Sequence, residues 1–385
     1  MKELFSSPWG DLRETFRRRF RSARMPLSRL TGTVNSSEEP LAILCGATKA
    51  NHAYLSEVCF NEPLTETNLG CPRLRDIFKR GAADDCALTI VETKLEQFAW
   101  LNDGSWFFIP AWVGGEVSLP LPEKISRTET VKADWRRIAR EGFEIEVTRD
   151  EERFKDFYYH LHLPLITQNF GASALIETYD KKRAQCKNFD LILLRRKSRP
   201  EHFVAGFLVV YELDAPRIWS AGVRDGNPAE VRAGALAALY HLSLARLAQN
   251  GFTRVSLGKS RPFLRDGVLK FKRKLEQRLT PGYTRGWALK IQSLTPAVKQ
   301  FLRNNPFIFQ SGGKFNTAIF SDTVPTVEQM IRLASDYGQP GLEKMLVYHF
   351  ASPANSAPVA VPPELAARMV VRRAEELVSG QLHLP

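Results

Sequence analysis

The sequence predicts an α/β (α+β) fold of two units, each with a mixed, largely antiparallel sheet flanked by helices. Three observations lead to this prediction. The chain has 385 residues, which is more than one typical domain. Short apolar runs typical of strands alternate with amphipathic helical patterns. Three strand-like runs also follow one another closely between residues 189 and 223, which indicates an antiparallel meander.

Residues 1–35 form a separate basic amphipathic segment. An apolar side chain recurs every three or four positions, with arginines between, at Phe5, Trp9, Leu12, Phe16 and Phe20. This pattern is typical of a helix whose apolar face either packs on the body of the protein or lies at a membrane surface. Residues 1–30 are therefore the candidate contact with a membrane, and "TGTVNSSEEP" after them is expected to be a linker.

Residues 40–140 are predicted to form the first unit. "LAILCG" and "CALTIVE" are typical of strands, and "RLRDIFKRG" of a helix that ends at a glycine. Asn102-Asp103-Gly104 lies between two aromatic runs and predicts a hairpin. "KADWRRIARE" then predicts a helix that leads into the second unit.

Residues 145–320 are predicted to form the second unit. Helices over "DEERFKDFYYHLHLPLITQNFG" precede the meander of "FDLILLRR", "HFVAGFLVVYE" and "RIWSAGV". A long helix follows, with Asn227 as N-cap, Pro228 at its first position, Glu230 completing a capping box and Gly251 at its end. Because it is apolar nearly all round, it should be buried on the sheet, and "FTRVSLG" should return as a parallel strand.

Residues 325–385 are predicted to be a C-terminal helical segment. "TVEQMIRLASDYG" indicates one helix, and "ASPANSAPVAVPP" is a proline- and alanine-rich linker. A last helix is expected over about Glu364 to Val378.

The chain has a formal net charge of +12, which favours anionic partners. Eight basic residues gather between Lys259 and Arg278, against only Asp266 and Glu276, and this favours a phosphate-bearing partner. No apolar run is long enough to span a membrane. The five scattered cysteines form no C-x-x-C pair, which predicts reduced thiols in a cytoplasm and no metal site. We expect a cytoplasmic protein, either free or peripheral at the membrane.

The order of these elements resembles the GNAT acyltransferase fold. Residues 150–275 resemble the second unit of the Fem-type, peptidyltransferase-related group, whose members have tandem GNAT-like units. The likeness is carried by "LPLITQNFG", "ALAALYHLSLARLAQNG", "VSLGKSRPFLRDG" and "KFKRK". Two features depart from it: the acetyl-CoA signature R/Q-x-x-G-x-G/A is not clean in "AGVRDGNPAEVRAG", and the long helical arm of some Fem-type enzymes is not apparent.

The resemblance implies an N- or O-acyltransferase. An acyl group would move from a thioester donor, acyl-CoA or acetyl-CoA, to an amine or hydroxyl by direct attack. The acceptor would be a small molecule or an envelope or lipid precursor. Two alternatives stay open. One is a Fem-type aminoacyl-tRNA-dependent peptidyltransferase, in which the basic helix and the N-terminus hold tRNA in a salt-dependent manner. The other is a non-catalytic GNAT-like binding module.

Two places are candidates for holding the donor. Gly206 and Phe207, in the middle strand of the meander, could pair their backbone with an extended donor, or Gly206 could merely relieve packing. The helix start at Asn227, with Arg224 and Gly226 beside it, could bind pyrophosphate through free N–H groups and the helix dipole.

The basic stretch supplies a second set of candidates for binding phosphate. Ser260 and Arg261 precede a helix that Asp266 can cap, while Arg265 and Lys272 lie near the azimuth of Val268 at the edge of its inward face. That face is expected to contain Val268, Phe271, Leu275 and Leu279. Lys272 matches the lysine of the family's "FK" pair, which implies that it stabilises phosphate or the developing oxyanion. The alternative is a solvated charged helix face.

Four residues are candidates for the proton steps: Tyr240, Glu212, Asp225 and His241. Tyr240 matches the tyrosine of "ALY" and could protonate the leaving group, or it could be a structural residue of the buried helix. Glu212 could accept the proton of the acceptor, or it could be a solvated charge at the end of a strand.

Overall fold

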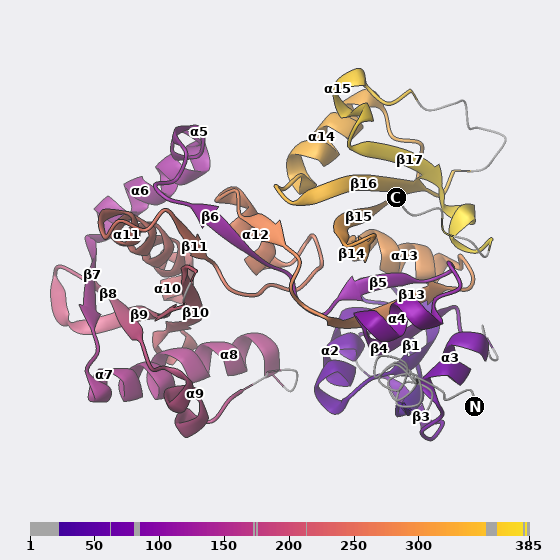
Figure 1. Cartoon of the computed structure of the whole chain (residues 1–385), viewed down its shortest axis with the longest axis horizontal. Coiled ribbons are helices and arrows are strands. Elements are labelled where there is room, and N and C mark those ends of the chain that lie inside the picture. Colours follow the sequence, from indigo (N-terminus) through magenta and orange to yellow (C-terminus); the bar gives the residue numbers. More distant parts are fainter. Residues whose placement is uncertain are drawn as a thin grey trace, which may run out of the picture.

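The computed structural model describes residues 23–61, 63–80, 85–171, 174, 176–212, 214–351, 360–379 and 382. It contains two sheets that lie on opposite sides of the molecule (Figure 1). Eleven of the strand pairings are antiparallel and four are parallel. The predicted fold class of two mixed, largely antiparallel sheets flanked by helices is confirmed. Residues 1–22, which contain most of the predicted amphipathic segment, lie outside the described residues.

The larger sheet has ten strands in the order β17-β16-β15-β14-β5-β13-β4-β2-β1-β3. Its strands come from the predicted first unit, from the end of the predicted second unit and from the C-terminal segment. They are β1 (Leu27–Thr33), β2 (Pro40–Gly46), β3 (Thr65–Asn68), β4 (Leu88–Lys94), β5 (Phe107–Pro110), β13 (Arg285–Ile291), β14 (Phe307–Ser311), β15 (Lys314–Ser321), β16 (Leu342–His349) and β17 (Met369–Arg373).

The smaller sheet has seven strands in the order β12-β6-β11-β10-β9-β8-β7. The chain enters it between β5 and β6 and leaves it between β12 and β13, so this unit is an insertion in the larger one and the expected boundary at 140–145 falls inside it. Its strands are β6 (Gly114–Ser118), β7 (Phe143–Thr148), β8 (Phe189–Arg196), β9 (Arg199–Tyr211), β10 (Pro216–Val223), β11 (Arg254–Ser256) and β12 (Arg278–Thr280).

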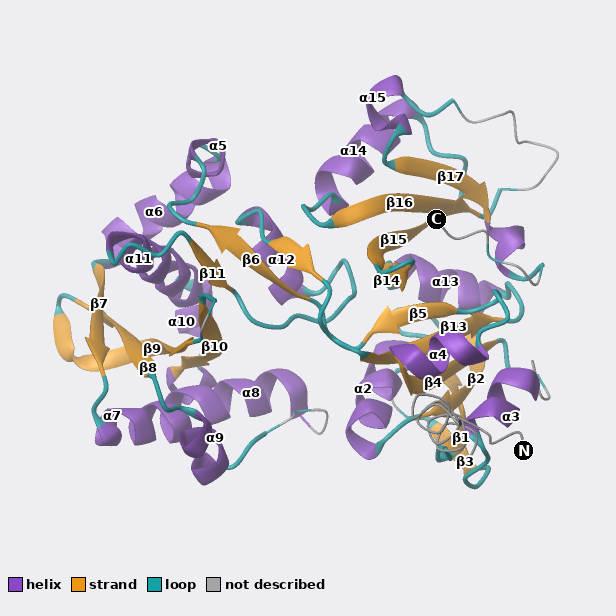
Figure 2. Ribbon diagram, in the orientation of Figure 1, coloured by secondary structure: helices purple, strands orange, loops and turns teal. Residues whose placement is uncertain are grey.

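Helices flank both sheets (Figure 2). With the larger sheet lie α2 (Lys49–Cys59), α3 (Leu74–Arg80), α4 (Leu95–Leu101), α13 (Pro296–Asn304), α14 (Val327–Tyr337), α15 (Pro363–Ala366) and the 3₁₀ turn η5 (Ala374–Leu377). With the smaller sheet lie α5 (Glu123–Ser126), α6 (Glu129–Glu141), α7 (Glu151–Asp156), the π-helix η1 (Phe157–His162), α8 (Leu163–Phe170), α9 (Tyr179–Gln185), η3 (Arg224–Gly226), α10 (Pro228–Arg232), α11 (Ala235–Gln249) and α12 (Gly267–Lys274).

The two faces of the smaller sheet are covered by different helices. Successive residues of β8 point to opposite faces, so Ile192 packs with α11 whereas Leu193 packs with Phe157 of η1. The predicted meander is confirmed, since β9 pairs antiparallel with both β8 and β10. The predicted parallel return strand is β11, which pairs with β10.

The long helix predicted after Asn227 is two helices. Asn227 does cap the first, α10, by accepting a hydrogen bond from the Ala229 N–H at 2.9 Å. The helix stops before Gly234, whose φ of +91° favours glycine, and α11 begins with Gly234 as its N-cap. A Cβ at Gly234 would lie 2.5 Å from Cδ of Arg137, so the Arg137 side chain of α6 packs directly on this glycine. The break creates a second helix start, at the buried residue Ala235.

Two other expectations are wrong. The hairpin expected at Asn102-Asp103-Gly104 does not form, because the run before it is helix α4, whose Phe98 packs against Phe108 at a ring distance of 5.2 Å. The last helix expected from Glu364 is only the short α15. The apolar residues after it form β17, which extends the larger sheet by pairing parallel with β16.

No helix among the described residues combines the length and the apolar character needed to cross a membrane.

Candidate functional site

The seven-stranded sheet opens between its two parallel strands. β10 and β11 share a single residue pair, Arg217 with Ser256. Two residues later, Gly258 turns the chain away with a φ of +71°. A Cβ at this position would lie 2.7 Å from the carbonyl oxygen of Ile218, so only glycine fits. The divergence leaves a cavity of about 660 Å³, a size typical of small-molecule sites.

Several elements of the inserted unit meet around this cavity, which we call the donor cavity. β10 supplies five consecutive residues, α11 supplies its first turns, and α6, α8 and α12 close the sides. Its lining includes Trp112, Asp134, Arg137, Ile166, Arg217, Ile218, Trp219, Ser220, Ala221, Gly234, Leu236, Ala237, Tyr240, Leu257, Gly258, Lys259, Val268, Phe271, Lys272 and Lys274.

The charge of the donor cavity is strongly unbalanced. One carboxylate, Asp134, faces five basic residues, while the remaining lining is mainly apolar and aromatic. The basic residues are Arg137, Arg217, Lys259, Lys272 and Lys274. A ligand with one anionic end and one apolar part matches this lining.

Lys272 lies in the wall of the donor cavity, as predicted from the sequence. Its side chain is 2% exposed, and its Nζ donates a hydrogen bond to the carbonyl oxygen of Lys259 at 2.9 Å. Burial lowers the pKa of Lys272 to about 7, while the nearby Asp266 carboxylate opposes this shift. Near neutral pH the amine is therefore balanced between its charged and neutral forms.

Tyr240 also lines the donor cavity. Its ring packs edge-on against Phe207 at 4.6 Å and lies 4.9 Å from Phe271 of α12. Burial raises the pKa of the Tyr240 phenol above its ordinary range, so the hydroxyl keeps its proton. The raised pKa makes the phenol a weaker acid, so its hydroxyl donates a hydrogen bond and transfers its proton only to a strong base, such as a thiolate buried in the same cavity.

The carboxylate of the cavity, Asp134, was not found by sequence reasoning. His241 of α11 lies behind it, with its Nε2 3.2 Å from Asp134 Oδ2. Burial lowers the pKa of His241, so the imidazole is neutral at pH 7 and its Nε2–H can orient the carboxylate. The two residues are 107 positions apart, and no local pattern in the sequence joins them.

Glu212 lies outside the lining of the donor cavity. Its carboxylate pairs with Arg217 at 2.5 Å, and the Arg217 guanidinium lies over the Trp219 ring at 5.3 Å. Glu212 therefore helps to place a basic cavity residue. Asp225, another candidate for the proton steps, is exposed and does not line the cavity.

Gly206 and Phe207, the residues of the predicted donor strand, do not line the cavity. Gly206 is enclosed, because a Cβ there would lie 3.0 Å from both Leu193 and Phe157, and Phe207 is fully buried in the core. The glycine serves packing, the alternative that the sequence left open. The strand that borders the cavity is β10, and the glycine that opens it is Gly258.

Three residues predicted to hold pyrophosphate are engaged in the fold instead. Arg224 pairs with Asp156 at 2.6 Å and donates to the Phe203 carbonyl. Gly226 has a φ of +64° and packs against α8, and Asn227 caps α10. None of the three lines the donor cavity; the helix start that does is that of α11, at Gly234.

The basic stretch is only partly directed into the cavity. Ser260 pairs through its backbone with Val113, Arg261 is buried between aromatic rings, and Arg265 is exposed and absent from the cavity lining.

The predicted inward face of α12 is rotated. Val268 is 43% exposed at the cavity rim, whereas Leu269 is fully buried, although Asp266 caps the helix as predicted by accepting from the Leu269 N–H at 2.8 Å. The buried residues of this eight-residue helix are Leu269 and Lys272.

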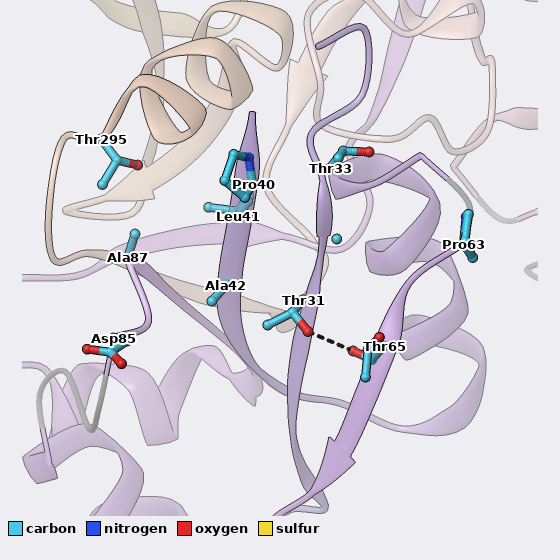
Figure 3. Close-up of a pocket in the computed structure, with 11 residues that line it drawn as sticks. Thr31, Thr33, Pro40, Leu41, Ala42, Pro63, Thr65, Asp85, Ala87 and Thr295 are labelled. Carbon is cyan, nitrogen blue, oxygen red and sulfur yellow. Dashed lines mark hydrogen bonds between the residues drawn. The ribbon is translucent and has the colours of Figure 1, made fainter. Parts of the chain in front are cut away.

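Another hollow, of about 630 Å³, lies at the edge of the ten-stranded sheet (Figure 3). We call it the first hollow, because most of its lining comes from the N-terminal part of the chain. Threonines, prolines and alanines line it, and Thr31 donates a hydrogen bond to the Thr65 carbonyl at 3.5 Å. Asp85 is its one charged lining residue. Its described lining contains no basic side chain.

No family model matches this chain, and no curated protein matches it. Solved structures do. The L-PGS structure from Bacillus licheniformis is 13% identical, with 75% of this chain and 93% of that chain covered and a TM-score of 0.34. FemX is 11% identical, with 71% and 86% covered and a TM-score of 0.33. A GCN5-related N-acetyltransferase from Sphaerobacter thermophilus is 12% identical, with 55% and 62% covered and a TM-score of 0.31. The group that the sequence resembles is thus represented among the similar structures.

Proposed function

We propose that this protein is an acyltransferase and that the donor cavity binds the carrier of its activated acyl group. The observation that carries the proposal is the divergence of β10 from β11, which opens a cavity lined by a strand edge, a helix N-terminus and five basic side chains. Acyl-CoA is the donor that fits this combination best, because it is extended, apolar along its middle and anionic at one end.

Each part of such a donor has a matching part of the cavity. Residues 218–221 of β10 follow the last pair with β11, so an extended chain can lie along them as an added strand does. The N–H groups of Leu236 and Ala237, in the first turn of α11, suit a diphosphate, and Arg137 lies beside them. Ile166 and Phe271 offer apolar surface to the rest of the donor.

The chemistry would be direct transfer. The acceptor amine or hydroxyl attacks the thioester carbonyl, a C–N or C–O bond forms, the C–S bond breaks, and the nucleophile loses a proton while the thiolate gains one. Asp134, held by His241, is the proton acceptor that the cavity offers. Tyr240 keeps its proton and can donate it to the thiolate, and Lys272 in its charged form can stabilise the oxyanion or a phosphate.

One observation favours an aminoacyl-tRNA donor as the second candidate. The basic side chains Arg265, Lys270, Lys274 and Arg278 are exposed on and around α12, and among the described residues none of them forms an ion pair. A row of free cations beside the mouth of the cavity suits a polyanion longer than coenzyme A. The acceptor in either case would be a small molecule or an envelope or lipid precursor.

Ligand-induced thermal stabilisation separates these candidates. We expect acetyl-CoA or a longer acyl-CoA to raise the melting temperature of the wild type, and Lys272→Met to reduce that shift. Stabilisation by aminoacylated tRNA that disappears at high salt would favour the second candidate instead. If neither donor stabilises the protein, the transferase proposal fails and a binding module without catalysis becomes the better account.

A further inference from the structure

The geometry points to Arg261 as a positioning residue through which the ten-stranded unit holds one wall of the donor cavity. Arg261 does not line the cavity, but Trp112 does, and the Arg261 guanidinium lies between Trp112 and Tyr54 of α2. We call this arrangement the Tyr54–Arg261–Trp112 stack. Its functional meaning rests on the proposed donor site, since it concerns the shape of that cavity.

The contacts within the stack are close on both sides. Cζ of Arg261 lies 3.7 Å from the ring centroid of Tyr54 and 4.0 Å from that of Trp112. Tyr54 is in turn stacked on Trp287 of the ten-stranded sheet, with centroids 5.7 Å apart and planes 20° apart. Successive ring contacts therefore connect Trp287, in the core of the ten-stranded unit, with Trp112, in the lining of the donor cavity.

Burying the charged guanidinium of Arg261 costs desolvation free energy, so its position needs a compensating interaction. Arg261 is 5% exposed, its Nη1 donates to the Ala111 carbonyl at 3.3 Å, and its buried Nε has no hydrogen-bond partner among the described residues. A flat, delocalised cation can stack on two aromatic faces at once, which a lysine ammonium cannot do. Arg261 thus fixes the ring of Trp112 from behind while leaving its other side to the cavity.

The backbone around Arg261 shows the same link. Residues 260–264 leave the smaller unit and lie on the larger sheet, where Ile308 donates to the Pro262 carbonyl at 2.8 Å and Phe263 bridges to Phe307. The same segment continues directly into α12, whose Phe271 and Lys272 line the cavity. Two walls of the cavity are therefore linked to the ten-stranded unit near Arg261. Trp112 is held by the Arg261 side chain, and α12 follows the backbone segment that lies on the larger sheet.

Tyr54 gives the cleanest test, because it belongs to the other unit and does not line the donor cavity. Tyr54→Ala removes one face of the stack, whereas Tyr54→Phe keeps the ring and is the matched control. Both variants are first shown to be folded by their cooperative melting. Acrylamide quenching of Trp112, taken as the difference between each protein and the same protein carrying Trp112→Phe, then reports the freedom of that ring directly.

We expect the Trp112 quenching constant to rise about twofold or more in Tyr54→Ala and to stay at the wild-type value in Tyr54→Phe, because only the first loses the cation–π partner. Equal quenching in wild type and folded Tyr54→Ala would overturn the inference. So would an equal rise in Tyr54→Phe, since the ring would then not be the part that matters. This readout needs no ligand, so it decides the stack even if the proposed donor is wrong.

Coenzyme A affinity, measured by calorimetry, tests the link to the cavity. We expect the Kd of coenzyme A to rise about fivefold or more in Tyr54→Ala and to change by less than about twofold in Tyr54→Phe, because a mobile wall must be ordered on binding. An unchanged Kd in a folded Tyr54→Ala with freed Trp112 would overturn the positioning role. A wild type that binds no coenzyme A would instead refute the proposed donor, and quenching alone would then judge the stack.

Discussion

The two hollows of this protein have nearly the same volume, about 630 and about 660 Å³, yet they differ in every property that bears on chemistry. The one on the ten-stranded sheet is lined by small neutral residues and one acid (Figure 3). The donor cavity is lined by five basic residues, aromatic rings, a helix start and the part of β10 that follows its last pair with β11. Volume alone therefore does not distinguish the two hollows, whereas the charge of the lining and the interrupted strand pairing do.

The largest effect is expected at the point where the strands diverge. Gly258→Ala should destabilise the protein by about 3 kcal/mol, because the new Cβ adds left-handed strain to an overlap with the Ile218 carbonyl. Chemical denaturation measures this. Gly313→Ala in the ten-stranded sheet is the control: its φ of +78° is similar but its surroundings are open, so it should cost only about 1 kcal/mol. Equal losses would mean that the divergence is not tightly packed.

Lys272, in the wall of the donor cavity, should make the free energy of unfolding depend on pH. The described lining of the first hollow contains no lysine. Its folded pKa of about 7 lies below its ordinary value of 10.5, so between these values the unfolded chain holds a proton that the folded chain lacks, and wild-type stability gains with rising pH. From pH 6 to 9, the free energy of unfolding of wild type relative to Lys272→Met should rise by about 3 kcal/mol. Lys270→Met, on the exposed side of the same helix, should give a flat difference. A flat difference for Lys272→Met as well would contradict its burial.

Tyr240→Phe should separate binding from chemistry. With the hydroxyl removed, turnover of an acyl-CoA substrate should fall about a hundredfold, since proton transfer to the leaving group is lost, while the Kd of coenzyme A stays nearly unchanged. Thr31→Val in the first hollow is the comparison and should alter neither quantity. If Tyr240→Phe kept full turnover, Tyr240 would be a packing residue only.

The smallest effect is expected at the rim. Glu212→Gln removes the charge that holds Arg217, and because this pair is half exposed, the coenzyme A affinity should change by less than about fivefold. Calorimetry at low salt would detect the change. A much larger loss would place Glu212 in the site after all.

The sequence predicted the elements of the fold better than their connections. Caps such as Asn227 and Asp266 are local, and each accepts the hydrogen bond that its position predicts. The insertion of one unit in the other was not visible, because pairing of β13 with β4 and β5 joins segments far apart in the chain. The apolar pattern of a strand predicts the strand itself but does not indicate which other strand it pairs with.

The site was predicted in part for the same reason. Lys272 and Tyr240 stand at positions that match the "FK" and "ALY" motifs of the family that the sequence resembles, and both line the donor cavity. Glycines were harder, since Gly206 and Gly258 look equivalent in sequence and only their neighbours distinguish a packing contact from a turn. Asp134 needed a partner from another helix before it could be seen as more than a surface acid.

Hydrogen–deuterium exchange with and without donor tests the central claim most directly. With acetyl-CoA, or with aminoacylated tRNA in a parallel sample, we expect protection of residues 217–221 and 257–259, which border the divergence, and no change around Thr31 and Thr65 in the first hollow. Protection confined to the first hollow, or none at the divergence with either donor, would contradict the assignment of the donor cavity.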